Sequence, residues 1–469
     1  MPEGANISGG QHHVLAILKQ GLRQVTRLRL NRFAIFAATV ALPLGAVMAQ
    51  SAAPVDPIGP LPEAKTGSAT TNPATTGAAT TQAAPPVAEP APLPPPPPPV
   101  WRVDQAAALL TYIQWIGREG LTPADYDPAG LDLAMRSSDP MVLAQAATDR
   151  FNKVSSDLAF GHVRGDARID WHVVDKDLDD VRQRLLLETA LRENRIVDAL
   201  NGLLPTHPQY GALKNALAVA AKGETQKINK IRLNMDRWRW LPRDLGQKYV
   251  IVNVPAFYAT LVENGVTRWK QRAVAGAIKT PTPQLSAMAT GVILNPWWEV
   301  PKSIEPEVRG KAGYVPVKGK DGKIQRWRQP PGPSNALGEM KFVMPNAQAI
   351  YLHDTNARSR FNSQIRAVSH GCVRTQNIHD LAAELGGDDS GEWTRTKIDE
   401  VLATDKTVEA KFVKPVPVHI VYFSVAALLD GSVINYSDLY KRDEQVIAAL
   451  LDTNGKAPGK EPAQKVATK

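Results

Sequence analysis

Residues 249–275, YVIVNVPAFYATLVENGVTRWKQRAVA, decide the fold of the second half of the chain. Tyr249–Val254 alternates with β-branched residues, and two further strand-like runs lie on either side of Asn264-Gly265. Asn-Gly between two such runs is the strongest short signal for a β-hairpin, because both residues tolerate the positive φ of the tight turn. The stretch therefore predicts paired strands at the start of a sheet.

The strand-like pattern continues to about residue 440, with one segment of different composition. Residues 301–337 are rich in Lys, Gly and Pro and contain Tyr314 and Trp327. Such a segment between strands predicts an excursion over the surface, which we expect to act as a mobile lid. A mostly β domain is thus predicted over 225–440, with the lid insertion at 301–337, further strands at Gly291–Val300, Ala349–His353 and Val418–Phe423, and short helices at Gln376–Leu385 and Thr394–Leu402.

The part of the chain before this domain has the period of α-helices. Two sets of residues recur at helical spacing: Ala106, Leu109, Leu110, Ile113 and Ile116, and then Val181, Leu185, Thr189, Ile196 and Leu200. Residues 101–224 therefore predict an all-helical domain, in which Asp157–Trp171 forms a long structured loop. The expected fold class is α+β, with the helical domain first, and residues 441–469 are expected to form a short helix and a disordered tail.

The N-terminus has the pattern of an export signal. Five basic residues from Lys19 to Arg32 precede an apolar run, Phe33–Met48, which ends in small residues before Gln50. The run is shorter than the roughly 20 residues of a spanning helix, so 1–49 predicts a cleaved signal peptide and a periplasmic protein. An uncleaved signal that tethers the protein to the inner membrane is the alternative. Residues 50–100, dominated by Ala, Pro and Thr, predict a disordered linker, because they bury too little apolar surface to fold.

The charge and the cysteine count narrow the function. The formal net charge is +9, with part of it in the predicted signal, which suits contact with an anionic cell-envelope surface. The sequence contains no zinc-finger spacing or dense basic helix, so no nucleic-acid partner is expected. Cys372 is the single cysteine. In an exported protein a lone thiol is either a small buried hydrophobe or a nucleophile.

The segment Ser369-His370-Gly371-Cys372-Val373-Arg374 favours the nucleophile. Gly371 allows backbone N–H groups to converge as an oxyanion hole requires, and Arg374 supplies a cation that favours a thiolate or holds a substrate carboxylate. A free thiol has a pKa of about 8.5 and needs a base at neutral pH. His353 is the preferred base because it ends a predicted strand, whereas His370 is expected to brace the turn and His379 to cap a helix.

These motifs resemble the catalytic domain of the L,D-transpeptidases (YkuD type). Further motifs, and the helical part as a scaffold domain, are similar to the larger YcbB-like branch of that family, so the resemblance covers roughly 101–450. The departures are a shorter lid and too little chain between the two domains for a peptidoglycan-binding module. The motifs are Arg237–Pro242 (RWRWLP), Asn295–Trp298 (NPWW), Arg328–Pro333 (RQPPGP), Tyr351–Thr355 (YLHDT) and Asp438–Tyr440 (DLY).

The resemblance implies a role for each site residue. Cys372 is implied as nucleophile, His353 as general base, and the backbone carbonyl of Asp354 as the group that orients the imidazole. The remaining roles are an oxyanion hole from His370, Gly371 and Cys372, donor positioning by Arg374 and Ser369, and substrate binding by Tyr351 and Trp298.

The implied function is acyl transfer from peptidoglycan tetrapeptide stems through a cysteine thioester, which forms 3-3 cross-links and releases D-alanine. L,D-carboxypeptidase activity and attachment of a wall protein by the same chemistry are alternatives, and a non-catalytic wall-binding protein is a more distant one. No cofactor is expected. No metal is expected either, because His353, His370 and Cys372 lack the usual ligand spacing. The sequence identifies no protein partner.

The signal pattern leads to a first prediction. Cleavage after Ala49 is expected, because the small-residue site follows the short apolar run directly. N-terminal sequencing of the protein from envelope fractions should therefore begin near Gln50. An intact Met1 would establish the uncleaved anchor instead.

Overall fold

The computed structural model of the protein describes residues 97–174, 178–387, 391–428 and 430–452. The predicted signal peptide, the predicted linker up to residue 96 and the predicted tail from residue 453 lie outside these ranges. Within them, no helix combines the length and the apolar character that a membrane span requires.

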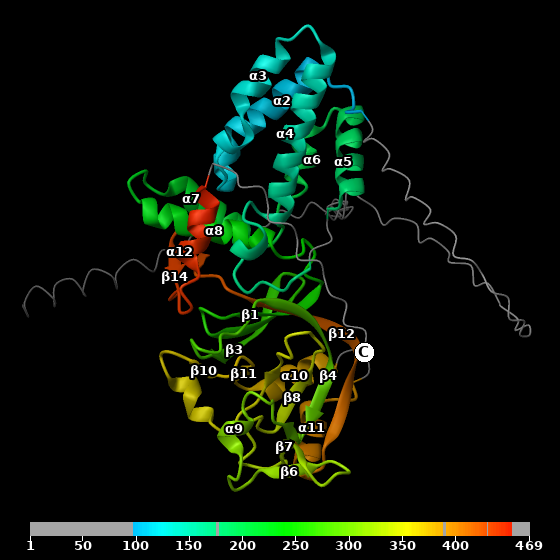
Figure 1. Ribbon diagram of the computed structural model, residues 1–469, viewed down its shortest axis with the longest axis vertical. Helices are drawn as coiled ribbons and strands as arrows, with labels where there is room; N and C mark the ends of the chain where they lie inside the picture. Colours follow the sequence, from blue (N-terminus) through cyan, green and yellow to red (C-terminus); the bar gives the residue numbers. More distant parts are fainter. Residues whose placement is uncertain (1–96, 175–177, 388–390, 429, 453–469) are drawn as a thin grey trace, which may run out of the picture. The chain divides into compact units, whose positions relative to one another are not determined.

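Helices occupy the first part of the described chain, as the sequence predicts (Figure 1). Ala106, Leu109 and Ile113 of the first helix are fully buried, which confirms the predicted apolar stripe. The helices are α2 (Val103–Gln114), α3 (Pro128–Met135), α4 (Pro140–Phe160), α5 (Asp180–Glu193), α6 (Ile196–Asn201), α7 (Pro208–Val219) and α8 (Thr225–Arg239), with 3₁₀ turns η1 (Ile116–Glu119), η2 (Pro123–Tyr126) and η3 (Gly165–Ala167).

The stripe expected from Val181 onward is wrong in its details. Val181 and Leu185 are exposed, and α5 instead buries Leu186, Leu187, Ala190 and Leu191. Asn194 ends the helix in the left-handed conformation, with φ of 57°. One helical period therefore cannot run through this residue, and α6 begins a new helix with its own buried face.

Helix α8 lies beyond Glu224, where a change to strand period was expected. Ile231, Met235 and Trp238 recur at helical spacing, but Asp236, Arg237 and Arg239 are buried as well. Because charged residues normally mark the solvent face of a helix, these buried charges conceal its amphipathic pattern. The strands begin only at Lys248.

The second part of the chain is built on a nine-stranded sheet in the order β10-β3-β11-β9-β8-β4-β12-β1-β2. β2 also pairs with β3, so the sheet closes on itself in a barrel-like way. The strands are β1 (Lys248–Asn253), β2 (Tyr258–Glu263), β3 (Val266–Gly276), β4 (Leu285–Leu294), β8 (Met340–Val343), β9 (Leu352–His353), β10 (Ala367–Ser369), β11 (Val373–Thr375) and β12 (Val408–Val421).

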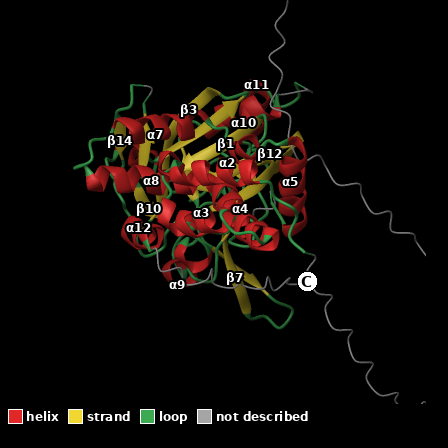
Figure 2. Cartoon of the chain, turned by 90° about the horizontal axis from the view of Figure 1, so that it is seen from above, coloured by secondary structure: helices red, strands yellow, loops and turns green. Residues whose placement is uncertain are grey.

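The predicted hairpin is confirmed. β2 and β3 pair antiparallel around Asn264 and Gly265, whose φ angles of 50° and 76° are those of a two-residue hairpin turn. The helices α10 (Ile378–Gly386) and α11 (Arg395–Leu402) also match the sequence, and they lie near the strands in Figure 2. A 3₁₀ turn, η4 (Arg358–Asn362), a hairpin of β13 (Val425–Ala427) and β14 (Val433–Asn435), and α12 (Asp443–Leu451) complete the described chain.

The insertion at 301–337 is more ordered than its composition indicates. It contains α9 (Glu305–Val308), β6 (Val315–Lys318) and β7 (Ile324–Gln329), and β7 pairs with both β6 and β5 (Trp298–Glu299). Val300, Ile304, Val308 and Trp327 form a small core of their own. Figure 1 shows α9, β6 and β7 grouped at one end of the sheet. Its motion as a lid stays a prediction.

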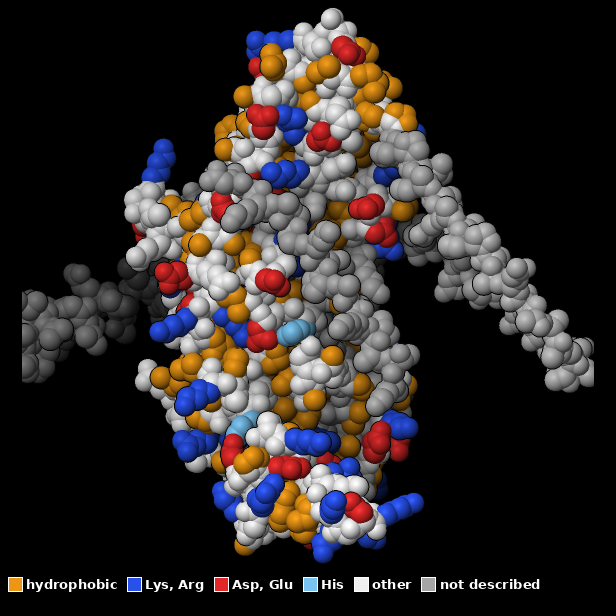
Figure 3. Space-filling view, viewed as in Figure 1, with side chains coloured by type: hydrophobic (Ala, Val, Ile, Leu, Met, Phe, Trp, Pro, Cys, Tyr) orange, Lys and Arg blue, Asp and Glu red, His pale blue; other side chains and the backbone are white. Residues whose placement is uncertain are grey.

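Basic and acidic side chains are interspersed on the face shown in Figure 3, with hydrophobic side chains gathered between them near its middle. Because charges of both signs alternate over this face, the electric fields of neighbouring side chains largely cancel. Salt screens what remains beyond about 10 Å.

A buried ion pair connects α8 to α12. Arg237 Nη1 lies 2.8 Å from Asp443 Oδ1, with both side chains buried, and the same nitrogen donates to Ser424 Oγ at 3.2 Å. The Arg237 guanidinium also covers the ring of Tyr422. The pair thus attaches the C-terminal helix to the last helix before the sheet.

Removal of one partner of this pair should destabilise the protein strongly. Asp443→Ala leaves the Arg237 charge buried without its carboxylate, so we expect a loss of about 3–5 kcal/mol of unfolding free energy. The matched control is Asp399→Ala, which breaks the exposed Arg395–Asp399 pair and should cost about 0.5 kcal/mol or less. Urea denaturation of both variants measures the difference, and equal midpoints would show that the buried pair stabilises the protein no more than the exposed pair does.

Candidate active site

The predicted nucleophile and base meet because β9 and β11 pair in parallel. In the register of this pair Val373 faces Leu352 and Arg374 faces His353, and Val373 N–H donates to the carbonyl of Tyr351 at 3.1 Å. Leu352 and Val373 are fully buried in the core. Since side chains alternate along a strand, Tyr351, His353, Cys372 and Arg374 lie on the opposite face.

Cys372 is a partly buried free thiol at the end of the β10–β11 turn. Its Sγ lies 3.8 Å from the carbonyl oxygen of Ala349. Burial raises the pKa of the thiol above its usual value, while hydrogen bonds from Tyr351 and the charges of Lys341 and Arg374 oppose that rise. The thiol is therefore protonated at neutral pH in the free protein.

His353 is buried, and burial lowers the pKa of its imidazole to about 4. The positive charge of Arg374, directly across the strand pair, lowers this pKa further, and the backbone of Asp354 and Leu337 partly opposes the effect. Within the described chain, Nδ1 has no hydrogen-bond partner of good geometry. The free site thus holds a neutral thiol beside a neutral imidazole. Proton transfer between them must accompany attack on a substrate.

The turn before Cys372 is held together by hydrogen bonds of Ser369 and Gly371, two residues that were predicted to contact the substrate. Gly371 has a φ of 113°, and a Cβ there would lie 3.2 Å from Ile350 Cδ1, so glycine is required. Its N–H donates to Ser369 Oγ at 3.2 Å, and that hydroxyl donates to the carbonyl of Cys372 at 2.5 Å. Buried Ser369 therefore shapes the turn, and the N–H of Gly371 is engaged there. The role of Ser369 in positioning the donor peptide stays a prediction. The N–H groups of His370 and Cys372 are the remaining oxyanion-hole candidates.

A chain of hydrogen bonds braces this turn from the C-terminal part of the protein. Thr282 Oγ1 donates to the carbonyl of Gly371 at 2.7 Å, and Thr282 N–H donates to the hydroxyl of Tyr440 at 3.2 Å. The N–H of Tyr440 in turn donates to the hydroxyl of Tyr422, which donates to Asp438 at 2.7 Å. The Asp438-Leu439-Tyr440 motif thus positions the backbone beside the nucleophile.

The remaining candidates lie around this centre. His370 is half exposed and its Nε2 lies 3.1 Å from Glu307 of α9, so its ring contacts the insertion and not the sulfur. Tyr351 lies beside the thiol and interacts with Trp298. Burial, and then the charge of Cys372, raise the pKa of Tyr351. Trp298 is partly buried and packs edge-on against Tyr314 of the insertion.

The side chain of Asp354 points away from the reaction and into a polar cluster. Its carboxylate accepts from Glu339 N–H at 3.0 Å and from Arg358 at 2.8 Å. Glu339, Asp354 and His379 have ligand atoms within 4.8 Å of one another, the one group of metal-binding size that the described ranges contain. Arg358 also pairs with Glu339 at 2.8 Å, so one guanidinium already lies between the two carboxylates. His379 belongs to this cluster, not to the thiol.

Lys341 is a site residue that the sequence reasoning missed. It lies on β8 directly opposite His353, and its Nζ is 5.4 Å from the centre of the Tyr351 ring. Burial lowers the pKa of this lysine, and the charge of Cys372 acts in the opposite direction. The signal was present in the sequence, because buried Met340 and Phe342 flank Lys341 and alternation places it on the site face.

Comparison with known protein families agrees with this geometry. Residues 247–402 match the L,D-transpeptidase catalytic domain (YkuD), and residues 97–217 match the Scaffold domain. A protein of Haemophilus influenzae named "Putative L,D-transpeptidase" is 28% identical over 292 residues, which are 56% of this chain and 58% of that relative. The chain therefore matches less than two thirds of the length of this relative.

Solved structures of low identity were also found. An L,D-transpeptidase from Mycobacterium smegmatis is 16% identical, with a TM-score of 0.21, over 37% of this chain and 58% of that one. An L,D-transpeptidase from Mycobacterium tuberculosis is 12% identical, with a TM-score of 0.21, over 37% and 57% of the two chains. At these values the family relationship rests on the sequence matches.

The position of Lys341 leads to a prediction on the reactivity of the thiol. Lys341→Met removes a positive charge that lowers the pKa of Cys372, so the thiolate fraction at pH 8 should fall by about three- to tenfold. The rate of iodoacetamide alkylation of Cys372 measures that fraction. Lys341→Arg should retain most of the rate, and Lys411→Met, on an exposed position of β12, should not change it. A wild-type rate in Lys341→Met would remove the lysine from the site.

Proposed function

Because this chain belongs to the L,D-transpeptidases that combine a Scaffold domain with a YkuD catalytic domain, we propose that it is a cysteine acyltransferase that forms 3-3 cross-links between peptidoglycan stem peptides. The observation that carries the proposal is the parallel β9–β11 register, which brings Cys372 and His353 to one face of the sheet. Without that register the single thiol would have no base.

The first half-reaction is attack of Cys372 on the carbonyl carbon of the third residue of a tetrapeptide stem. As the C–S bond forms, the thiol proton passes to His353, because neither group is charged in the free site. His353 then gives this proton to the departing amine of D-alanine as the C–N bond breaks. The low pKa of His353 suits the second step, since an imidazolium of low pKa releases its proton readily.

Three kinds of group stabilise the charges that develop during this step. The negative charge on the sulfur is offset by Lys341 and Arg374, which lie on either side of His353 across neighbouring strands. The N–H groups of His370 and Cys372 are the candidates to donate hydrogen bonds to the oxyanion. The hydroxyl of Tyr351 interacts with the sulfur and can orient it.

In the second half-reaction an amine of another stem attacks the thioester and releases Cys372. Water as acceptor would make the same centre an L,D-carboxypeptidase, and a protein amine would attach a protein to the wall. The predicted signal peptide supports action in the periplasm, where the stems are found. The positive net charge of the chain supports contact with the anionic cell envelope.

The proposal is tested with purified tetrapeptide stems and with a carbapenem, whose strained carbonyl resembles the acyl donor. Wild type should release D-alanine and gain the mass of the drug on Cys372. Cys372→Ala and His353→Ala should each lower D-alanine release by at least about 10³-fold, and the double variant should lose little more, because a nucleophile and its base act as a unit. Intact-mass spectrometry and muropeptide analysis provide both measurements.

Two observations would contradict the assignment. One is a drug adduct that persists on Cys372→Ala. The other is a His353→Ala variant that releases D-alanine at the wild-type rate while its thermal unfolding is unchanged.

A further inference from the structure

Two threonines that follow β3 contact the catalytic turn through their hydroxyl groups. Thr280 Oγ1 donates to the carbonyl of Ser369 at 3.0 Å. Thr282 Oγ1 donates to the carbonyl of Gly371 at 2.7 Å, and Thr282 is fully buried. The Thr282 oxygen also accepts from Gly276 N–H at 2.8 Å, so its single proton is directed to the turn.

Each of these two carbonyls shares a peptide unit with one candidate donor of the oxyanion hole. The carbonyl of Ser369 belongs to the unit that carries the N–H of His370. The carbonyl of Gly371 belongs to the unit that carries the N–H of Cys372. A peptide unit is planar and trans, so its C=O and its N–H point in opposite directions. A hydroxyl that fixes the direction of the carbonyl therefore also fixes the direction of the N–H.

The two N–H groups are available to a substrate. Within the described ranges, those of His370 and Cys372 have no hydrogen-bond partner in the protein, whereas the N–H of Gly371 between them donates to Ser369 Oγ. Gly371 has a φ of 113°, and glycine permits wide rotation of the peptide unit that follows it. Thr282 thus supplies a constraint on this unit that glycine itself lacks.

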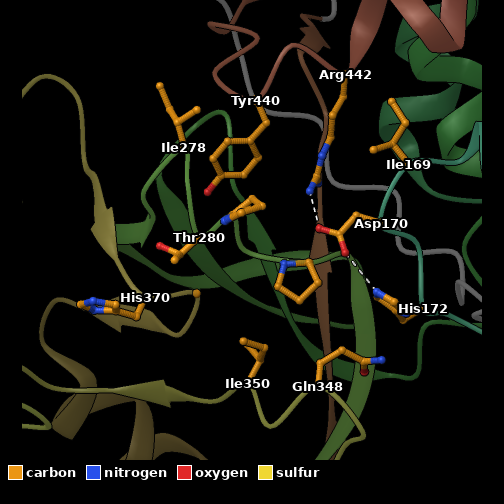
Figure 4. A pocket seen from close by; sticks show the side chains of 13 residues that line it. Ile169, Asp170, His172, Ile278, Thr280, Gln348, Ile350, His370, Tyr440 and Arg442 are labelled. Carbon is orange, nitrogen blue, oxygen red and sulfur yellow. Dashed lines mark hydrogen bonds and ion pairs between the residues drawn. The ribbon is translucent and has the colours of Figure 1, made fainter. Parts of the chain in front are cut away.

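The threonines are held in turn by the C-terminal part of the chain. A cavity of about 520 Å³ lies beside the turn, and Thr280 and Tyr440 line it together (Figure 4). The N–H of Thr282 donates to the Tyr440 hydroxyl at 3.2 Å. The Tyr440 ring lies 4.9 Å from the guanidinium of Arg442, which pairs with Asp170, as Figure 4 shows. The charges behind Tyr440 are therefore paired with each other and hold its ring in place.

The helical part of the chain holds the same segment through its backbone. Gln284, two residues after Thr282, donates its N–H to the carbonyl of Asp170 at 2.9 Å and accepts from the N–H of His172 at 2.8 Å. Its side chain donates to the carbonyl of Ile169 at 3.0 Å. These partners lie in the stretch that matches the Scaffold domain. The segment that carries both threonines is thus fixed from outside the matched catalytic domain.

We propose that Thr280 and Thr282 are positioning residues of the oxyanion hole. Through the two carbonyls they direct the N–H groups of His370 and Cys372 toward the oxygen of the donor carbonyl. Both hydroxyls act through the backbone, because their protons are already donated to it. The inference rests on the proposed function, because an oxyanion forms only when the thiol attacks a carbonyl group.

Thr282→Val is the sharpest test, because it removes the hydroxyl and keeps the branched shape of the side chain. The kcat for D-alanine release from the tetrapeptide stem should fall about 10- to 100-fold, since one donor to the oxyanion is misaligned. The KM should stay within about twofold, because the oxyanion does not exist in the bound ground state. Thr282→Ser keeps the hydroxyl and should retain at least about half of the wild-type kcat.

Alkylation by iodoacetamide separates the direction of the N–H groups from the reactivity of the thiol. In this reaction the sulfur displaces iodide from a saturated carbon, and no oxyanion forms. The alkylation rate of Cys372 in Thr282→Val should therefore stay within about twofold of wild type, while acylation by the stem and by the carbapenem slows. A general loss of the turn would slow alkylation and acylation together.

Two further variants grade and control the effect. Thr280→Val should slow D-alanine release by only about two- to tenfold, because Ala277 N–H also donates to the carbonyl of Ser369, at 2.8 Å. The matched control is Thr111→Val in α2, whose hydroxyl donates to the carbonyl of Ala107 at 2.9 Å. Its loss should change neither the acylation rate nor the alkylation rate.

D-alanine release at the wild-type rate in Thr282→Val would overturn the proposal. An equal fall in its alkylation rate would do the same, because the variant would then have lost the turn itself. Thermal unfolding checks that each variant is folded at the assay temperature, and if Thr282→Val is not, Thr280→Val decides by the same two rates. Failure of the proposed function is distinguishable, since in that case wild type itself releases no D-alanine.

Discussion

The parallel pairing of β9 with β11 is the constraint on which the site depends. Each strand is only two or three residues long, yet the register sets Arg374 opposite His353 and sends Leu352 and Val373 into the core. A slip by one residue would exchange the two faces and bury the nucleophile while exposing two aliphatic side chains. The hydrophobic core therefore specifies on which face of the sheet the predicted nucleophile and base lie.

Together with the β8–β9 pairing, that register also places one cation on each side of His353. Lys341 on β8, His353 on β9 and Arg374 on β11 are directly opposite one another. Burial and the charge of Arg374 lower the pKa of the imidazole and keep it neutral, while Lys341 and Arg374 oppose the effect of burial on the pKa of the thiol. The arrangement avoids a resting thiolate, the form of cysteine that is oxidised most readily, and still lowers the energy of a thiolate that forms during the reaction.

The helical part and the C-terminus contribute to the same turn through polar contacts. Tyr440 and Thr282 position the carbonyl of Gly371, and Asp438 anchors the hydroxyl of Tyr422 at the other end of that series. Asp443, a few residues further on, pairs with Arg237 of α8. Residues that are remote in sequence thus hold the nucleophile in place, because a short turn with a positive φ at Gly371 has too few internal contacts to define itself.

The sequence by itself determined the α+β class, the hairpin at Asn264-Gly265, the single thiol and its strand-borne histidine, because periodicity, turn chemistry and residue type are local properties. Only the tertiary structure decided the rest. It extended the helices through α8, whose buried charges conceal the helical pattern, and gave the insertion a core of its own. It made Ser369 and the N–H of Gly371 parts of the turn, and it added Lys341 to the surroundings of Cys372. Those roles depend on which strands are neighbours and which polar groups find partners inside the fold, and pairings between distant segments leave no periodic signal in a single sequence.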